Sequence, residues 1–219
     1  MTTLLHIECS PRKQRSASLE IARQFIARYQ QNAPDTQVVT LDLWALELPE
    51  FAGPVMDAKY AGIAGTPLSA EQSAAWTTLT ALAAHLHQAD VLVFSVPLWN
   101  FAIPYKLKHF IDVVSQKDVL FEFSPEHGVR GLLHDKIAVN VYARGMDFSA
   151  PGAQGMDFQK PYMEAWLGVI GVTDVHSLYV EKTILGAEVD QVSRLESAGM
   201  ALKLSLIHIS EPTRLRRIS

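Results

Sequence analysis

The chain has 219 residues, of which 48% are hydrophobic and 19% charged, and its formal net charge is −4. This length suits one α/β domain with a full core, and the composition excludes a disordered chain. No basic excess points to a nucleic acid or a membrane as partner. A single cysteine, Cys9, excludes an internal disulfide. With no signal-peptide pattern and no apolar run long enough to span a bilayer, a cytoplasmic location is expected.

The first quarter of the chain alternates strand and helix patterns. A short apolar run predicts a strand at Thr3–Glu8. Apolar residues at helical spacing predict a helix at Ser18–Gln31, and Gln37–Leu43 follows as a second strand. Leu48–Pro67 contains three prolines and three glycines and is expected to be a long irregular excursion.

The alternation continues through the middle of the chain. Ser69 and Gln72 form a capping-box pattern that starts an amphipathic helix. Val91–Val96 is nearly all apolar, as expected of a parallel strand that is covered on both faces. A helix follows at Leu107–Val114. The alternating aromatic, acidic and turn residues of Leu120–Gly131 predict a small hairpin or loop insertion.

Two further strand and helix pairs complete the domain. The strands are expected at Lys136–Tyr142 and Val175–Val180, and the helices at Pro161–Ile170 and Glu188–Lys203. This alternation implies right-handed crossovers and a doubly wound parallel sheet, an α/β fold flanked by helices. Five strands suit the flavodoxin-like order 2-1-3-4-5, which binds ligands beyond the carboxyl ends of its first and third strands.

The last part of the chain, residues 204–219, differs from the rest. It reads LSLIHISEPTRLRRIS, and Leu204–Arg214 resembles the in-frame translation of a transposase sequencing adapter. We therefore expect one domain over residues 1–203 followed by a non-native tail. The alternative is a natural basic tail.

The polar segment between the first strand and the first helix, Ser10–Ser18, is a candidate phosphate site. A phosphate there meets serine hydroxyls, unpaired backbone N–H groups and the positive end of the helix dipole. Three basic residues, Arg12, Lys13 and Arg15, raise the local potential. The segment lacks both G-x-G-x-x-G and a P-loop lysine motif. The alternative is an ordinary helix cap in a polar loop.

The segment Pro97–Pro104, PLWNFAIP, follows the third strand at the predicted ligand edge. Its two prolines stiffen a loop that carries an indole, a carboxamide and a phenyl ring. Such a loop can hold a flat heteroaromatic ring while Asn100 and backbone groups bond its polar edge. The alternative is a structural loop with its aromatic side chains packed inward.

Pro97–Pro104 resembles the P-x-[YW]-N-F-x-x-P signature of the FMN-dependent azoreductase and NADH:quinone reductase family. Ser10, Ser16 and Ser18 occupy the positions of the phosphate-loop serines of that family. Leu167–Asp174, LGVIGVTD, resembles its F-[IL]-G-[FI]-x-G-x-x-D stretch. The resemblance covers essentially the whole predicted domain. It implies bound FMN, NADH or NADPH as electron donor, and a quinone or aromatic azo compound as acceptor.

The resemblance also implies where the flavin lies. The phosphate is expected on Ser10 and the Ser16–Ser18 turn, and the ring system against Leu98–Phe101. Its pyrimidine edge is expected near the loop after the fourth strand, where backbone N–H groups would stabilise the reduced flavin. The family commonly has Ser-Arg-Gly-Gly in that loop, so Ala143 and Met146 are departures. The expected cofactor-binding residues are Ser10, Ser16, Ala17, Ser18, Leu98, Trp99, Asn100, Phe101, Ala143, Arg144, Gly145 and Met146.

The expected mechanism is a ping-pong transfer in which the protein sets geometry and electrostatics, with no catalytic acid or base among its side chains. The resemblance implies a homodimer whose partner subunit contributes aromatic residues from Phe51–Tyr60 or Leu120–Phe123. Two alternatives remain: a flavodoxin-type electron-transfer protein, and a flavin-free regulatory protein on the same fold.

Other chemistry has little support in the sequence. His85 and His87 point in different directions on a helix, so they are expected to be surface or capping residues instead of metal ligands. Cys9 is expected to be a small filler at the end of a strand.

Overall fold

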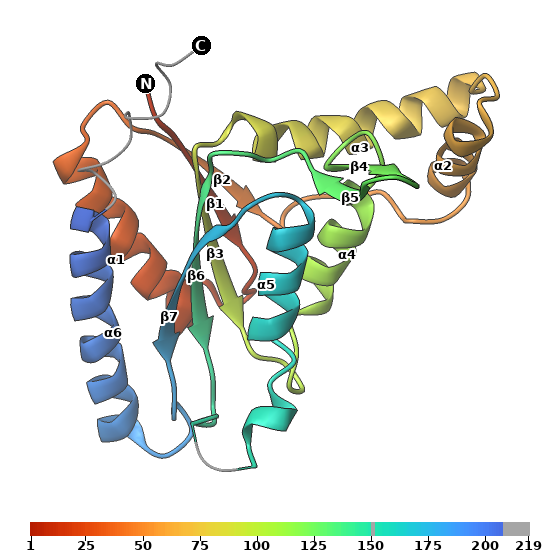
Figure 1. Ribbon diagram of the computed structural model, residues 1–219. Helices are drawn as coiled ribbons and strands as arrows, with labels where there is room; N and C mark the ends of the chain where they lie inside the picture. The colour runs from red at the N-terminus through yellow and green to blue at the C-terminus, as the bar shows by residue number, and fades with distance from the viewer. Residues whose placement is uncertain (150–151, 208–219) are drawn as a thin grey trace.

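The computed structural model describes residues 1–149 and 152–207. It consists of three layers, with helices on both faces of a central parallel sheet (Figure 1). The helices α1 (Ala17–Asn32) and α6 (Ala187–Ile207) cover one face. The other face is covered by α3 (Ala70–Gln88), α4 (Tyr105–Val114) and α5 (Lys160–Val169). The apolar residues of each face pack into one of two cores, so every central strand is buried on both sides.

The sheet has the order β2-β1-β3-β6-β7, and all its strand pairs are parallel. This is the flavodoxin-like order predicted from the sequence, and the predicted strands are confirmed to within one residue at each end. The strands are β1 (Thr3–Glu8), β2 (Gln37–Asp42), β3 (Val91–Pro97), β6 (Ile137–Ala143) and β7 (Asp174–Val180).

The predicted helices are also present, with small shifts at their ends. Ser69 caps α3 as predicted, since its hydroxyl accepts the Gln72 N–H while the Gln72 side chain bonds the Ser69 N–H. Two short 3₁₀ segments, η1 (Lys13–Arg15) and η2 (Gln154–Met156), lie in loops. The helices are α1 (Ala17–Asn32), α3 (Ala70–Gln88), α4 (Tyr105–Val114), α5 (Lys160–Val169) and α6 (Ala187–Ile207).

The prediction of an irregular excursion at Leu48–Pro67 is wrong, because the segment contains the helix α2 (Pro54–Ala64). Pro54 stands in the first turn, where its missing N–H costs no hydrogen bond. Gly65 ends the helix with a left-handed φ of 67°, the usual use of glycine after a last turn. Pro54 and Gly65, residue types that often interrupt helices, therefore mark the two ends of this helix.

The predicted hairpin is confirmed as β4 (Phe121–Ser124) paired antiparallel with β5 (Gly128–Gly131). Together with α2 and the far end of α3, it projects from one corner of the molecule (Figure 1). The backbone of the hairpin at Gly131 packs directly against the backbone at the end of α5. A Cβ added at Gly131 would lie only 2.1 Å from the Gly171 nitrogen, so this contact requires glycine.

The last helix continues four residues past the predicted end at Lys203. Leu204 packs against the core under α1 and α6, and Ser205 is buried, so the buried face of the helix extends into the predicted tail. The remainder of that tail, residues 208–219, lies outside the described residues. None of the described helices is long and apolar enough to cross a membrane.

Candidate functional site

The three predicted loops lie side by side, because they follow neighbouring parallel strands at the same edge of the sheet. The N–H of Cys9, after β1, donates to the Ser95 carbonyl of β3 at 3.3 Å. The N–H of Leu98, after β3, donates to the Ala143 carbonyl of β6 at 2.8 Å. The fold therefore brings three loops into one site. They are Ser10–Ser18, the candidate phosphate loop, then Pro97–Pro104, the aromatic loop, and Ala143–Met146.

The phosphate loop buries all three of its candidate serines, Ser10, Ser16 and Ser18. Ser16 is the N-cap of α1, and its Oγ accepts the Leu19 N–H at 3.4 Å. The hydroxyls of Ser16 and Ser18 are 3.2 Å apart. Ala17 and Ser18 stand in the first turn of the helix, where backbone N–H groups have no partner within the helix. Hydroxyls and free amides at a positive helix end form a donor set that fits a phosphate.

The three basic residues of this loop differ in their surroundings. Arg12 and Arg15 are exposed. Lys13 makes ion pairs with the carboxylates of Glu8 and Asp42. Of the three residues predicted to raise the local potential, Lys13 therefore has its charge compensated by carboxylates of the protein.

The aromatic loop contains a tight reverse turn. Trp99 and Ala102 exchange both backbone hydrogen bonds, at 2.9 and 3.0 Å. The two residues between them, Asn100 and Phe101, have φ values of 47° and 70°, the backbone pattern of a type I′ turn. A left-handed φ is uncommon for phenylalanine, and such conformations cluster at functional sites. The turn leaves both side chains exposed.

Trp99 belongs to a cluster of three aromatic rings that the sequence did not reveal. The ring centroids of Trp44 lie 5.6 Å from Trp99 and 5.3 Å from Tyr105. The Trp44 Nε1–H donates to the Cys9 carbonyl at 3.0 Å. Trp44 therefore joins the end of β2 to both the phosphate loop and the aromatic loop. The sequence did contain one indication of this role, since Trp44 directly follows a predicted strand at the edge where ligands are expected.

The side chain of Arg144 is turned inward, with only 3% of it exposed. Its guanidinium donates to Gln159, Asp157 and Glu181 at 2.9, 2.8 and 3.2 Å. It also lies over three aromatic rings, about 5 Å from each centroid. The Arg144 N–H donates to the Val180 carbonyl at 2.8 Å. Arg144 therefore has its polar groups satisfied by the protein and holds the loop in place.

The other members of this loop are more accessible. Ala143 and Gly145 are half-buried and Met146 is exposed. A Cβ added at Gly145 would approach the Ile184 side chain to 3.1 Å, which is a tight contact with a movable group. The backbone of Gly145 and Met146, instead of the Arg144 side chain, is the part of the loop that can face a ligand.

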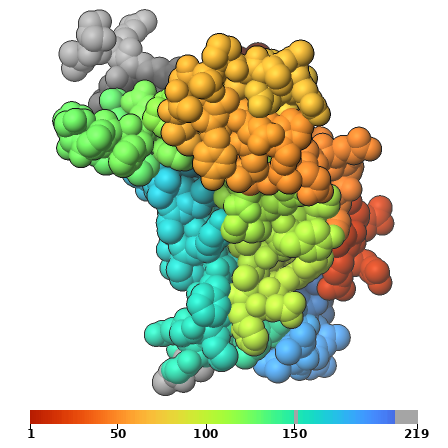
Figure 2. Space-filling model, turned by 90° about the vertical axis from the view of Figure 1, so that its right-hand side faces the viewer, coloured from red at the N-terminus to blue at the C-terminus, as the bar shows by residue number. Residues whose placement is uncertain are grey.

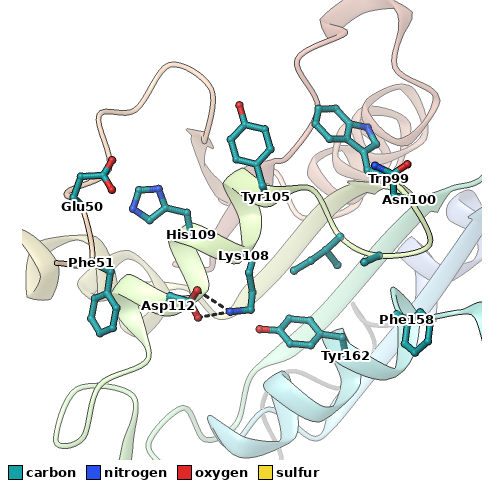
Figure 3. Close-up of a pocket in the computed structure, with 12 residues that line it drawn as sticks. Glu50, Phe51, Trp99, Asn100, Tyr105, Lys108, His109, Asp112, Phe158 and Tyr162 are labelled. Carbon is teal, nitrogen blue, oxygen red and sulfur yellow. Dashed lines mark hydrogen bonds and ion pairs between the residues drawn. The ribbon is translucent and has the colours of Figure 1, made fainter. Parts of the chain in front are cut away.

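A cavity of about 680 Å³ lies beside the aromatic loop, against α4 and α5 (Figure 3). Of the twelve predicted site residues, only Trp99 and Asn100 line it. The cavity wall also includes Phe51, Tyr105, Lys108, Asp112, Phe158 and Tyr162, none of which the sequence singled out as a cofactor contact. Figure 2 looks onto this face, where α4 and α5 lie side by side below α2 and α3.

Lys108, Asp112 and Tyr162 point toward one another in this cavity (Figure 3). The Lys108 Nζ donates to both Asp112 oxygens, at 2.6 and 2.7 Å. This hydrogen bond raises the pKa of Lys108, and burial raises the pKa of Tyr162. At neutral pH the lysine is therefore a compensated cation and the tyrosine a neutral donor.

Cys9 and His87 have structural surroundings. Cys9 is fully buried, and burial raises the pKa of its thiol well above the ordinary value, so the thiolate is strongly disfavoured. His87, on α3, hydrogen-bonds the Val119 carbonyl at 2.7 Å. No group of three His, Cys, Asp or Glu side chains among residues 1–149 and 152–207 is arranged to hold a metal ion.

The chain is similar to known proteins over most of its length. A family described as a flavodoxin-like fold matches residues 2–201. The chain is 60% identical to FMN-dependent NADH:quinone oxidoreductase 3 of Pseudomonas fluorescens, covering 94% of this chain and 96% of that protein. It is 47% identical to FMN-dependent NADH:quinone oxidoreductase 9 of Burkholderia lata, covering 90% and 97%. The azoreductase structure from Bacillus anthracis superposes with a TM-score of 0.85 at 26% identity, covering 94% and 99%.

Proposed function

Because the chain belongs to the family of FMN-dependent NADH:quinone oxidoreductases and azoreductases, we propose that it holds FMN across its three loops. Its activity is that of an FMN-dependent NADH:quinone oxidoreductase, and FMN supplies the hydride chemistry when it is bound. The single observation that carries the proposed location is the meeting of the phosphate loop and the aromatic loop at the ends of β1 and β3. This is the position where doubly wound folds bind nucleotides.

The phosphate is proposed to bind at Ser10, Ser16 and Ser18 and at the N–H groups of Ala17 and Ser18. Buried hydroxyls suit this task because they are already desolvated and oriented, so little ordering is required on binding. The helix dipole of α1 adds a favourable interaction with the phosphate charge.

The ring system is proposed to lie against Leu98–Phe101 and to extend toward Ala143, Gly145 and Met146. The type I′ turn fixes the backbone of Asn100 and Phe101, so both side chains project from a defined position in the loop. Backbone N–H groups of Gly145 and Met146 would face the pyrimidine edge and favour its negative charge after reduction. Arg144 supports this loop from beneath through its ion pairs.

Donor and acceptor are proposed to occupy the cavity beside the aromatic loop in turn, which is a ping-pong cycle. The aromatic walls, from Phe51, Trp99, Tyr105, Phe158 and Tyr162, suit flat substrates such as a nicotinamide, a quinone or an aromatic azo compound. Either NADH or NADPH serves as donor in this proposal.

We further propose that the protein is a cytoplasmic homodimer with the flavin near the interface. Tyr60 of α2 and Phe123 of the hairpin are exposed large rings on the corner that projects from the molecule (Figure 1). A second copy seated against the α4 and α5 face would cover such rings and close the cavity. Cross-linking or sedimentation of the holoprotein measures this directly, and a monomer would contradict it.

Absorbance spectroscopy of the purified holoprotein, before and after NADH, tests the proposed function. We expect a flavin spectrum that bleaches with NADH and recovers when menadione is added. Protein that binds no FMN would contradict the cofactor site. Bound flavin that NADH and NADPH leave oxidised would instead favour an electron-transfer protein.

A further inference from the structure

Four charged side chains meet beneath the phosphate loop. The Glu8 carboxylate, which is only 9% exposed, accepts from Arg23 Nη2 at its Oε1, 3.0 Å away. Its other oxygen, Oε2, lies 3.4 Å from the Lys13 Nζ. Lys13 also forms an ion pair with Asp42. Each carboxylate oxygen of Glu8 thus contacts a different cation, so Glu8 bridges Lys13 and Arg23.

The four residues come from four separate elements around the proposed site. Glu8 ends β1, Lys13 lies in the phosphate loop, Arg23 is on α1 and Asp42 ends β2. Asp42 also accepts the Trp44 N–H at 3.1 Å, which connects the cluster to the aromatic rings. The cluster therefore ties the loop, the helix and both strand ends to one another.

The Lys13 backbone shows what this bridge maintains. Its φ of 47° is in the left-handed region, which a non-glycine residue adopts only when its surroundings hold it there. In that conformation the Lys13 carbonyl accepts the N–H of Ser16 at 3.0 Å. The ion pairs of Lys13 therefore help to fix the position of Ser16, the serine that caps α1.

We propose that Glu8 is a positioning residue for the phosphate of FMN, acting through Lys13 on the loop and through Arg23 on α1. The inference rests on the proposed phosphate site. The charges of the two cations and the two carboxylates cancel, so the cluster contributes geometry instead of net charge.

The direction in which FMN affinity changes when the Glu8 charge is removed distinguishes positioning from electrostatic repulsion. Glu8 lies two residues before Ser10, and Coulomb repulsion alone predicts tighter phosphate binding when its charge is removed. Positioning predicts weaker binding.

The test is titration of the apoprotein with FMN and with riboflavin, in which the quenching of flavin fluorescence reports binding. We expect Glu8→Gln and Lys13→Met each to raise the Kd for FMN about tenfold, as for loss of an oriented charge-assisted hydrogen bond. Riboflavin has no phosphate, so its Kd should change less than about twofold. Lys13→Arg keeps the cation and should restore FMN binding.

Glu20→Gln is the matched control, because Glu20 is also on α1 and its ion pair with Arg194 leads to α6, away from the loop. It should leave both Kd values within about twofold of the parent protein. Asp42→Asn keeps the test decisive if Glu8→Gln does not fold, because Asp42 is the other carboxylate partner of Lys13 and is partly exposed. Coulomb repulsion alone again predicts tighter FMN binding, and positioning predicts weaker binding.

Tighter or unchanged FMN binding in Glu8→Gln, or in Asp42→Asn if Glu8→Gln does not fold, would overturn the inference, and so would an equal loss for FMN and riboflavin. Ser18→Ala separates this failure from that of the underlying site. If Ser18→Ala weakens FMN alone while the two cluster variants do not, only the positioning role fails. If Ser18→Ala changes neither flavin, the phosphate site itself is wrong.

Discussion

Replacement of Arg144 by methionine is expected to destabilise the fold strongly. The variant keeps an unbranched apolar stem but removes the guanidinium that serves Gln159, Asp157 and Glu181. Removing one partner from a buried ion pair costs about 3–5 kcal/mol, because the remaining charge stays desolvated. At roughly 2–4 °C per kcal/mol for a domain of this size, the midpoint of thermal unfolding should fall by about 10 °C.

The pH dependence gives this prediction a second readout. Burial raises the pKa of Glu181, and the Arg144 charge opposes that rise. Without Arg144 the pKa of Glu181 in the folded protein rises further above its unfolded value. A raised carboxyl pKa means that the folded state gains protons more readily, so acidification favours the variant relative to the parent. The stability deficit should therefore shrink as the pH falls from 7 toward 5.

Urea unfolding of both apoproteins, followed by far-UV circular dichroism, measures these differences. Arg130→Met is the matched control, since Arg130 is exposed on the hairpin, and it should change the free energy of unfolding by less than about 0.5 kcal/mol. A loss below about 1 kcal/mol for Arg144→Met, or a deficit that does not depend on pH, would refute the reasoning.

Three other changes test separate parts of the structure. Gly131→Ala should cost more than about 3 kcal/mol of unfolding free energy, because its Cβ would meet the Gly171 backbone; an effect below 1 kcal/mol in urea unfolding would contradict this. Burial lowers the pKa of His6 to about 4, so the parent protein should lose about 3 kcal/mol of stability as the pH falls from 6.5 to 4. In His6→Gln this component should be absent, and identical pH profiles would argue against it. Asp112→Asn should free the Lys108 ammonium and raise kcat/KM about fivefold for a sulfonated naphthoquinone relative to its uncharged parent; an unchanged ratio would place Lys108 outside the acceptor site.

The fold was largely predictable because its signals are local. The central strands β1, β3 and β6 contain short apolar runs, and α3 carries its own capping box in Ser69 and Gln72. The exception, α2, shows the limit of that reasoning. Proline and glycine mark helix ends as well as breaks, and only Val55 and Ala58 of this helix are buried. The apolar pattern of α2 was too weak to show whether its proline and glycine mark the ends of a helix or interrupt one.

The site was predictable only in part. Chain order and strand order together determined that Ser10–Ser18, Leu98–Phe101 and Ala143–Met146 meet at one edge, since parallel strands align their carboxyl ends. The sequence did not show that Arg144 is turned inward, because its partners are up to 37 residues away along the chain. Nor did it show Trp44 or the Glu8 bridge, whose members come from different elements.

The sequence by itself therefore determined the strand order, the family and the loops that are proposed to hold the flavin. These follow from periodicity and from short motifs, each of which acts over a few neighbouring residues. Only the tertiary structure decided which side chains face the site and which support it. Whether a side chain faces the site or supports it depends on burial and on the pairing of charges that are distant in the sequence. A buried cation is stable only beside a counter-charge, and only the fold determines which residue supplies it.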